Sequence, residues 1–483
     1  MRQNILKLIS IAFLGGVVGR GFRYVSEIVI ARSLGPDALG LFAFGLVVMT
    51  TISVPVRLGL DNAAQKFIPQ YQKEDSSKLV GTTISCIAIP LVVGSIVSLS
   101  FYFFFPVFMG KYIAEDYGNI VLLFAIGIPL HAGMVIGLSA TRGFKETKYS
   151  VYIRDFGQSG VAILSAFIGG VLLDSLEAVI IGYILSLLFG LSLALYFLFK
   201  LGAIRTSVLP KTNLSTLLSF SLPLTFAAVV HHLLTWTDIL MLGAFIQPTE
   251  VGWYQAAFRT AQILAILLGA VNALFPSLAA DLYDQGDTAG LRQIYSGLTK
   301  WVLYFTLLGY IFIFVYAEEI LLIFGTSTVS AQHAMLLLGA AQVIVVGTGP
   351  IGYLLNMTGY ERLQLLNALG AGLVNVVLNF VLIHWLGIVG AALATGISLS
   401  LLNLARLVET WKLLDFHPYS SEYWRGGVAL LGTIPLLYFS QYLPLSMTSK
   451  LPLAGVFSLL LFSTIVLSIG LSSKDKALLN SVK

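Results

Sequence analysis

Charged side chains are scarce in this chain of 483 residues, where Asp, Glu, Lys and Arg together make up only 11%. A soluble globular domain carries about 25%, so a water-facing surface of the usual kind cannot be built from this sequence. Cys86 is the single cysteine, which excludes an intrachain disulfide and a cysteine-based metal site. The adjacent pair His231 and His232 points to opposite sides of a helix. We therefore expect neither a metal site nor a cofactor.

Motifs of soluble enzymes are also missing. The sequence contains no Walker loop, no zinc-ligand spacing and no nucleophile elbow. No polar connection is long enough to form a catalytic domain, and the net charge of +5 is too modest to indicate nucleic-acid binding. The sequence therefore predicts that the protein is not an enzyme and has no nucleic-acid partner.

Apolar residues make up 57% of the chain, and the mean hydropathy is +0.89. Because a helix needs about 20 mainly apolar residues to cross a bilayer, this composition predicts an all-α polytopic membrane protein. Fourteen apolar stretches separated by short polar breaks fit this length. We place them at 8–33, 39–60, 80–106, 118–140, 150–173, 178–199, 216–243, 251–279, 298–324, 332–357, 364–386, 388–411, 426–444 and 451–471. The shortest of the breaks is the turn at Leu386–Gly387.

The positive charges predict the orientation. With the N-terminus inside, 19 of the 28 Lys and Arg fall in inner segments and only three in outer ones. Such an excess marks the cytoplasmic side, so both termini are expected in the cytoplasm and the protein in the plasma or inner membrane. Arg2 and Lys7 before an apolar run resemble a signal peptide, but the helical pattern continues to Leu34 and predicts an uncleaved first span.

The chain contains an apparent internal repeat. Pro36 and Gly40 of LGPDALGLF recur 212 residues later as Pro248 and Gly252 of IQPTEVGWY. Weaker matches pair Pro69 with Pro276 and Gly143 with Gly359, although chance similarity between apolar segments is the alternative. A repeat of six spans keeps the same orientation in both halves, as parallel repeats do in some transporters. The expected divisions are residues 1–212 for spans 1–6, 213–412 for spans 7–12, and 413–483 for spans 13–14 and the tail.

Four segments give the chain a resemblance to a known family. They are LGPDALGLFAFG, VRLGLDNAAQKFIPQYQKED, VGWYQAAFRTAQILAILLGAVNALFPSLA and GIVGAALATGIS. With the order and number of the spans, they resemble the polysaccharide-exporter branch of the multidrug/oligosaccharidyl-lipid/polysaccharide (MOP) superfamily. The resemblance implies two six-helix lobes in a V around a central cavity. It also implies alternating access that moves a lipid-linked, pyrophosphate-bearing saccharide from the inner to the outer leaflet.

Charges inside the predicted spans are the candidate site, because a charge in hydrocarbon is costly and usually functional. Arg20 and Arg23 lie near the middle of the first span, on one helical face. Arg57 lies near the inner end of the second span, and Arg259 lies in the outer part of the eighth. Guanidinium groups stay charged and bind phosphate through two hydrogen bonds, so these four arginines are predicted to contact the pyrophosphate. The resemblance matches Arg57 and Arg259 to motif positions, the latter in Y-x-x-A-x-R, whereas Arg20 and Arg23 match by span and depth only.

Structural alternatives exist for each of these charges. Glu27 follows Arg23 by four residues and could neutralise it, and Asp238 could pair with Arg259 across the turn between spans 7 and 8. Arg57 could extend its side chain to lipid phosphates, and Asp61 could be an ordinary polar residue at a helix end. We keep Glu27, Asp61 and Asp238 as candidate ion-coupling or salt-bridge residues. The pairs Arg154–Asp155 and Arg406–Glu409, near inner helix ends, are expected to be ordinary surface pairs, and the inner-loop cations, Arg142 among them, to be topology signals.

These observations favour a flippase for a lipid-linked oligosaccharide used in surface polysaccharide or glycan assembly. One alternative is a cation-coupled exporter of drugs or other small molecules from the same superfamily, which would need carboxylates in the middle of the bundle. Another is a membrane scaffold for polysaccharide enzymes that transports nothing. The expected partners are the lipid-linked saccharide and membrane lipids. A coupling ion, Na⁺ or H⁺, and contacts with polysaccharide-assembly enzymes are left open, as are the sugar and the carrier lipid.

Overall fold

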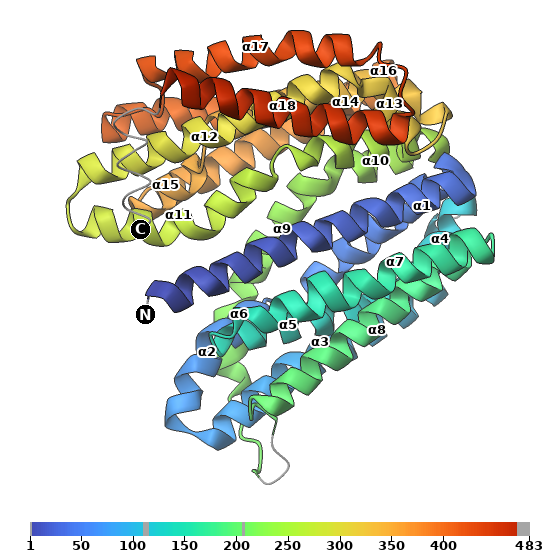
Figure 1. Cartoon of the computed structure of the whole chain (residues 1–483). Coiled ribbons are helices and arrows are strands. Elements are labelled where there is room, and N and C mark those ends of the chain that lie inside the picture. Colours follow the sequence, from blue (N-terminus) through green and yellow to red (C-terminus); the bar gives the residue numbers. More distant parts are fainter. Residues whose placement is uncertain (1, 110–114, 205–207, 471–483) are drawn as a thin grey trace. The chain divides into compact units, whose positions relative to one another are not determined.

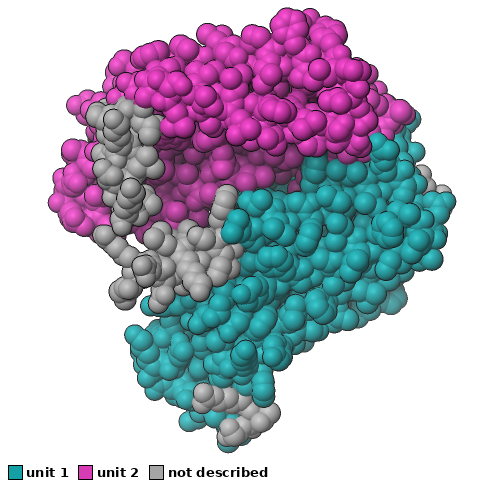
Figure 2. Space-filling view, in the orientation of Figure 1, with its two compact units in different colours: residues 1–255 teal, residues 256–483 magenta. Residues whose placement is uncertain are grey.

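The structure is a computed structural model, and it describes residues 2–109, 115–204 and 208–470. These residues form helices and connecting turns, without a β-strand among them. Figure 1 shows the helices coloured along the chain. The chain divides into two compact units, residues 1–255 and 256–483, coloured separately in Figure 2.

The described residues of unit 1 form nine α-helices and two π-helical segments, and the unit ends within a tenth α-helix. Its elements are α1 (Arg2–Val56), α2 (Leu60–Glu74), α3 (Ser76–Met109), α4 (Glu115–Ala125), α5 (Gly127–Gly143), α6 (Thr147–Ser150), the π-helix η1 (Val151–Gln158), α7 (Ser159–Phe167), the π-helix η2 (Ile168–Leu172), α8 (Leu176–Lys200), α9 (Leu214–Phe245) and the first half of α10 (Pro248–Ile263). Helix α9 belongs to this unit because it packs closely on two neighbours. Gly59 lies against the backbone of Ser221, and Gly243 lies against the ring of Phe44.

Unit 2 begins within α10 and contains the C-terminal helices. Its elements are α11 (Ile266–Asp284), α12 (Thr288–Val315), α13 (Ala317–Leu322), the 3₁₀ helix η3 (Ser327–Ala331), α14 (Gln332–Gly347), α15 (Ile351–Met357), α16 (Glu361–Leu414), the 3₁₀ helix η4 (Ser421–Tyr423), α17 (Trp424–Ser440) and α18 (Met447–Ile469). One aromatic cluster of this unit joins α12, α17 and α18 through Tyr304, Ala429 and Phe462.

Ten helices of the described chain are long and apolar enough to cross a membrane, and the count is eleven if the bent pair α4–α5 forms one span. Two of the ten, α1 and α16, are each broken by one glycine. Gly35, with φ 89°, interrupts α1 just before Pro36, which suits the first turn of a new helix. Gly387, with φ 54°, interrupts α16 at the turn predicted from the sequence. The second half of α16 then folds back on the first, since Gly390 lies against the carbonyl oxygen of Leu382.

A proline explains the bend of 47° between α4 and α5. Pro129 has no N–H to donate to the carbonyl of Ala125, four residues earlier. The hydroxyl of Ser98, on α3, donates to that carbonyl oxygen at 2.8 Å. A neighbouring helix thus supplies the hydrogen bond that the proline removes, as the bilayer requires because it offers no water.

Candidate functional site

Two glycines bring α1 and η1 into close contact and thereby position Arg23. A Cβ atom at Gly15 would overlap with the side chain of Val151, and one at Gly19 would overlap with Asp155. Because residues four apart share a helical face, Arg23 lies on the same side of α1 as both glycines. Small residues allow helices to approach closely within membranes, so this spacing places the guanidinium of Arg23 at the surface of η1.

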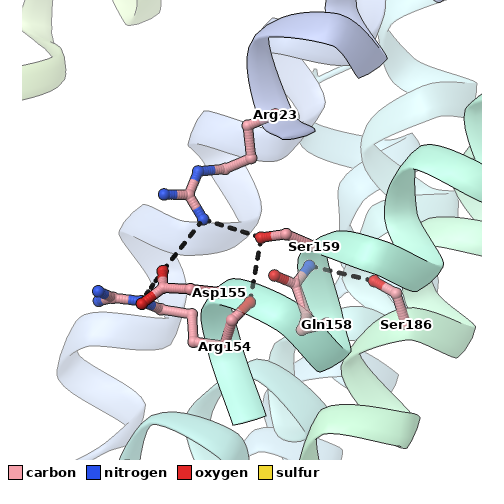
Figure 3. Close-up of polar contacts among 6 residues, drawn as sticks. All are labelled: Arg23, Arg154, Asp155, Gln158, Ser159 and Ser186. Atoms are coloured by element: carbon pink, nitrogen blue, oxygen red, sulfur yellow. Dashed lines mark hydrogen bonds and ion pairs between the residues drawn. The ribbon is translucent and has the colours of Figure 1, made fainter. Parts of the chain in front are cut away.

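The guanidinium of Arg23 reaches across to η1 and α7, as Figure 3 shows. Its Nη1 donates to Ser159 Oγ at 3.0 Å and lies 3.9 Å from Asp155 Oδ1. The same carboxylate oxygen accepts a hydrogen bond from Nε of Arg154 at 3.2 Å. Asp155 is buried, with 3% of its side chain exposed, whereas the side chains of Arg23 and Arg154 are 36% and 46% exposed. The buried carboxylate of Asp155 therefore contacts two half-exposed guanidinium groups.

A cavity of about 250 Å³ opens beside these groups, between α1, α5, η1 and α8. We call it the arginine cavity, because Arg23, Arg142 and Arg154 all line it, and the side chains of His131 and Gln158 lie in its wall. Its described lining residues include no carboxylate. Three guanidiniums thus line the cavity, and the buried Asp155 carboxylate contacts two of them. The arrangement is suited to an anion.

The segment that holds Arg154 is itself unusual. Residues Val151–Gln158 form a π-helix, and π-helical turns are frequent at functional sites. Gln158, at its end, is held by a hydrogen bond from Nε2 to Ser186 Oγ of α8 at 3.1 Å (Figure 3). Ser159 Oγ donates to the carbonyl oxygen of Arg154 at 3.0 Å. These bonds fix the side of the cavity that carries Arg154.

Of the four arginines predicted from the sequence, Arg23 alone lines the arginine cavity. Arg20 is exposed on α1 and is not among the lining residues. Arg57 directly follows α1, in the turn before α2, and its Nη1 lies 3.3 Å from Oδ2 of Asp61, so these two predicted charges form an ion pair. Arg259 belongs to unit 2, where its Nη1 donates to Gln262 Oε1 at 3.5 Å.

The two other predicted carboxylates are buried and hydrogen-bonded by neutral groups. Gln255 Nε2 donates to Glu27 Oε1 at 3.1 Å, and the hydroxyl of Tyr254 donates to Asp238 Oδ2 at 2.5 Å. Glu27 is 4% exposed and Asp238 3% exposed. Their predicted function as coupling groups stays a prediction.

The two turns of the predicted repeat contact each other. Gly40 lies against the carbonyl oxygen of Pro248, and Gly252 lies against that of Pro36. Thr249 Oγ1 also donates a hydrogen bond to Asp37 Oδ1. Asp37 and Thr249 are 212 residues apart in the sequence. Each glycine contact joins the glycine of one turn to the proline of the other turn. A glycine is needed at both positions because a side chain would overlap with the facing backbone.

Sequence reasoning missed two of the three arginines in the cavity. Arg142 had been assigned to membrane topology alone, and Arg154 to a surface pair with Asp155. The pair does exist, but Asp155 is buried and also contacts Arg23. The spacing of Gly15, Gly19 and Arg23 in the sequence signals the close helix contact at Arg23, but no such spacing marks Arg142 or Arg154.

The chain is similar to known proteins in both sequence and structure. The family model described as "Polysaccharide biosynthesis protein" matches residues 5–280, which is more than half of the chain. The probable low-salt glycan biosynthesis flippase Agl15 of Haloferax volcanii is 23% identical over 464 residues, and the match covers 94% of each chain. Stage V sporulation protein B of Bacillus subtilis is 23% identical over 455 residues, covering 87% of this chain and 86% of that protein.

Solved structures show the same fold. The lipid II flippase MurJ in an inward closed conformation has a TM-score of 0.73 at 14% identity, covering 95% of this chain and 98% of that one. An inward-facing multidrug transporter of the MATE family, in the MOP superfamily, has a TM-score of 0.69 at 14% identity, covering 82% and 94%. These comparisons confirm the resemblance found in the sequence. They also confirm the all-α multi-pass membrane fold and the assignment to flippases and transporters rather than enzymes.

Proposed function

Because the chain belongs to the polysaccharide biosynthesis protein family, within the MOP superfamily, we propose that it moves a lipid-linked, pyrophosphate-bearing saccharide from the inner to the outer leaflet by alternating access. The curated relative that matches 94% of the chain is named as a probable glycan biosynthesis flippase. A substrate of this kind needs a route on which its charged group always has a partner, since an unpaired charge in hydrocarbon costs several kcal/mol.

The arginine cavity is the observation that carries this proposal. A pyrophosphate esterified at both ends bears one negative charge on each phosphate, and three guanidiniums line the cavity. Guanidinium groups bind such oxygens with paired, charge-assisted hydrogen bonds. A cationic drug would meet the opposite arrangement, three guanidiniums with no carboxylate among the described lining residues. We therefore prefer the anionic lipid to the cationic drug as substrate.

The architecture we propose has fourteen spans. The breaks at Gly35 and Gly387 divide α1 and α16, which adds two spans to the eleven, and α17, with 17 residues, supplies the last. Residues 1–212 and 213–412 are proposed to form two lobes in a V around a central cavity, followed by 413–483. The excess of Lys and Arg in inner segments supports cytoplasmic termini.

The route we propose passes the pyrophosphate from the arginine cavity along Arg20, Arg57 and Arg259, with Arg142 and Arg154 added to the predicted set. Arg142 ends α5 next to the turn at 144–146, which the positive charges assign to the cytoplasmic side. The cavity would then receive the substrate from the inner leaflet. Glu27, Asp61 and Asp238 remain candidates for coupling to Na⁺ or H⁺, and polysaccharide-assembly enzymes remain candidate partners.

Reconstituted vesicles test the function directly. The probe is a polyprenyl pyrophosphate bearing one N-acetylglucosamine, and the readout is its loss from the outer leaflet, measured with a lectin that cannot cross the bilayer. The wild-type protein should equilibrate the probe between leaflets far faster than empty vesicles do, and Arg23→Ala should remove most of this acceleration. Equal rates in wild-type and protein-free vesicles would overturn the proposal, and so would export of a cationic dye in place of the lipid.

The contact between Asp37 and Thr249 tests the alternating movement. In a protein with Cys86→Ala, cysteines at these two positions should form a disulfide that holds the turns together. If the lobes separate during each cycle, oxidation should stop lipid transfer and a reductant should restore it. Full transfer by the oxidised, cross-linked protein would contradict a movement at this contact. The matched controls are the two single-cysteine variants, which should respond to neither treatment.

A further inference from the structure

Unit 2 contains a second cavity that the proposed function does not use. It measures about 370 Å³ and lies between α11, α14, α15 and α16. Five of its described lining residues are polar and uncharged, and one is an arginine: Asn272, Tyr353, Asn356, Gln364, Asn403 and Arg406. We call it the amide cavity. Its volume falls within the range of about 300–1,000 Å³ that is usual for small-molecule sites.

Breaks in the helices create this space. Helix α14 ends at Gly347 and α15 begins at Ile351, and Gly349 and Pro350 of the break between them line the cavity. Gly352 of α15 leaves room for two side chains of α16. A Cβ atom there would lie 3.1 Å from Gln364 Nε2 and 3.4 Å from Arg406 Nη1. The absence of a side chain at Gly352 therefore keeps both groups at the cavity wall.

One amide of the cavity is fixed by its surroundings. The hydroxyl of Thr348 donates to Asn403 Oδ1 at 3.3 Å, and Asn403 Nδ2 donates to the carbonyl oxygen of Leu399 at 2.8 Å. Asn403 is 5% exposed. Its hydrogen bonds are thus made within the protein, and it forms a rigid part of the wall.

Three other polar atoms at the cavity are buried and have no hydrogen-bond partner in the described part of the chain. They are Asn272 Oδ1, Gln364 Oε1 and Arg406 Nε. Leaving such an atom unbonded costs about 1–3 kcal/mol, and most buried polar atoms in proteins have a partner. Two of these atoms accept hydrogen bonds and the third donates one. A single ligand that bonds to all three atoms must therefore offer both donors and acceptors.

Hydroxyl groups meet this requirement, and an ionised phosphate does not, because it has no hydrogen to donate. Each side-chain amide offers an acceptor and a donor, which matches a ring carrying several hydroxyls. The ring of Tyr353, 41% exposed, gives the cavity a flat apolar surface as well. A single guanidinium among amides also provides far less positive charge than the arginine cavity does.

We propose that the amide cavity binds a hydroxylated sugar unit, the saccharide portion of the transported lipid. This inference rests on the proposed function for the identity of the ligand, but its site is separate from the arginine cavity in sequence and in chemistry. The orphaned oxygens of Asn272 and Gln364 accept from sugar hydroxyls, and Arg406 Nε donates to a sugar oxygen.

Saturation-transfer NMR tests this site with soluble probes. The protein is held in phospholipid nanodiscs, because glycoside detergents would compete, and the probes are methyl β-D-glucopyranoside and methyl N-acetyl-β-D-glucosaminide. At least one of them should receive saturation at its ring protons. Gly352→Val should remove the signal, because the added side chain occupies the cavity beside the flexible ends of Gln364 and Arg406. The double variant with Asn272→Leu and Gln364→Leu should also remove it. Gly347→Ala, a helical position with only ordinary contacts, should retain it.

The outcomes separate this proposal from the proposed function. Absence of transfer to either glycoside, an unchanged signal in a folded Gly352→Val protein, or displacement of the glycoside by inorganic pyrophosphate would each overturn it. Thermal unfolding verifies that each variant is folded. Arg142→Gln should lose lipid transfer and keep glycoside binding. If the protein binds the glycoside but transfers no lipid, the sugar site is supported and the flippase proposal is contradicted.

Discussion

The cavities of the two units differ in the side chains that line them. In the proposed repeat, the match of Gly143 with Gly359 sets Arg142 of α5 against Thr358 and Arg154 of η1 against Gly370 of α16. Unit 1 thus has three guanidiniums at its cavity, and unit 2 has one guanidinium among amides. Under the proposed repeat, related segments of the chain therefore carry side chains of different chemistry at the two cavities.

The difference also predicts how each cavity recognises its ligand. Charge attraction in the arginine cavity acts over a distance and tolerates many geometries. Hydrogen bonds in the amide cavity require donors and acceptors at defined positions. A pyrophosphate is common to all lipid-linked saccharides of this kind, whereas the sugar differs between them. We expect unit 1 to bind the common part of the substrate and unit 2 to select its variable part.

The largest expected effect comes from removing one charge in unit 1. Arg142→Gln should weaken the binding of inorganic pyrophosphate about 10- to 100-fold, because a hydrogen bond to a charged group contributes about 1.5–3 kcal/mol. Arg406→Gln, in unit 2, should leave this affinity unchanged. Isothermal titration of the nanodisc-embedded protein measures both.

A nearby lysine serves as the matched control for Arg142. Lys148 pairs with Glu146 at 2.8 Å and does not line the cavity. Lys148→Gln should therefore bind pyrophosphate as the wild type does. Equal losses in the Arg142 and Arg406 variants would mean that the two cavities do not differ in the way we describe.

A backbone change in unit 2 should have the next largest effect. Gly349 has φ +66°, and a Cβ atom there would also overlap with the hydroxyl oxygen of Thr299. Gly349→Ala should destabilise the protein by about 1–3 kcal/mol, as strained backbone positions do, and abolish glycoside binding. Pyrophosphate binding by unit 1 should remain.

At Gly347, two residues before Gly349, substitution by alanine should not lower the unfolding temperature. Gly347 is helical, and the nearest atom to an added Cβ is Leu303 Cδ1 at 3.5 Å, an ordinary contact. Gly347→Ala should leave the unfolding temperature unchanged or raise it slightly, because alanine favours a helix. A similar fall in the unfolding temperature for both variants would contradict a special requirement at Gly349.

The all-α multi-pass membrane fold could be predicted from the sequence, and the partners of the charges could not. Hydropathy and glycine placement locate the turn at Gly387, because these are local properties, whereas the ion pair of Arg57 with Asp61 was not among the predicted pairs. The contact of Arg23 with Asp155 joins residues 132 positions apart. It depends on how α1 packs on η1, and local spacing offered only Glu27 as a partner.

The residues of the arginine cavity also could not be predicted from local sequence spacing. An arginine near a helix end serves equally well as a topology signal or as part of a site, and sequence position does not distinguish the two. Arg142 and Arg154 line the same cavity as Arg23 because the bent α5 and the π-helical η1 place them there. The residue types were visible in the sequence, but their convergence is a tertiary property.

Asp155→Asn should change the charge of the arginine cavity in the opposite direction. Asp155 competes with a bound anion for Arg23 and Arg154, so its neutralisation should strengthen pyrophosphate binding up to about five-fold. The figure follows from the contribution of about 1 kcal/mol or less that partly exposed ion pairs make. Glycoside binding in unit 2 should not change. Weaker pyrophosphate binding in a variant with the wild-type unfolding temperature would show that Asp155 holds the arginines in place rather than competing for them.

The smallest expected effect concerns the bend that leads into the wall of the arginine cavity. Ser98 donates to the carbonyl of Ala125 that Pro129 leaves free, so Ser98→Ala should cost about 0.6–1 kcal/mol, the usual contribution of such a bond between membrane helices. Ser95→Ala is the matched control, because Ser95 bonds only to Leu91 of its own helix. Thermal unfolding in nanodiscs should show a small decrease for Ser98→Ala and none for the control. Pyrophosphate binding should weaken less than two-fold, since Arg142 lies at the far end of α5, while the amide cavity of unit 2 keeps its affinity for the glycoside. Equal decreases in the two serine variants would show that the bend does not depend on this hydrogen bond.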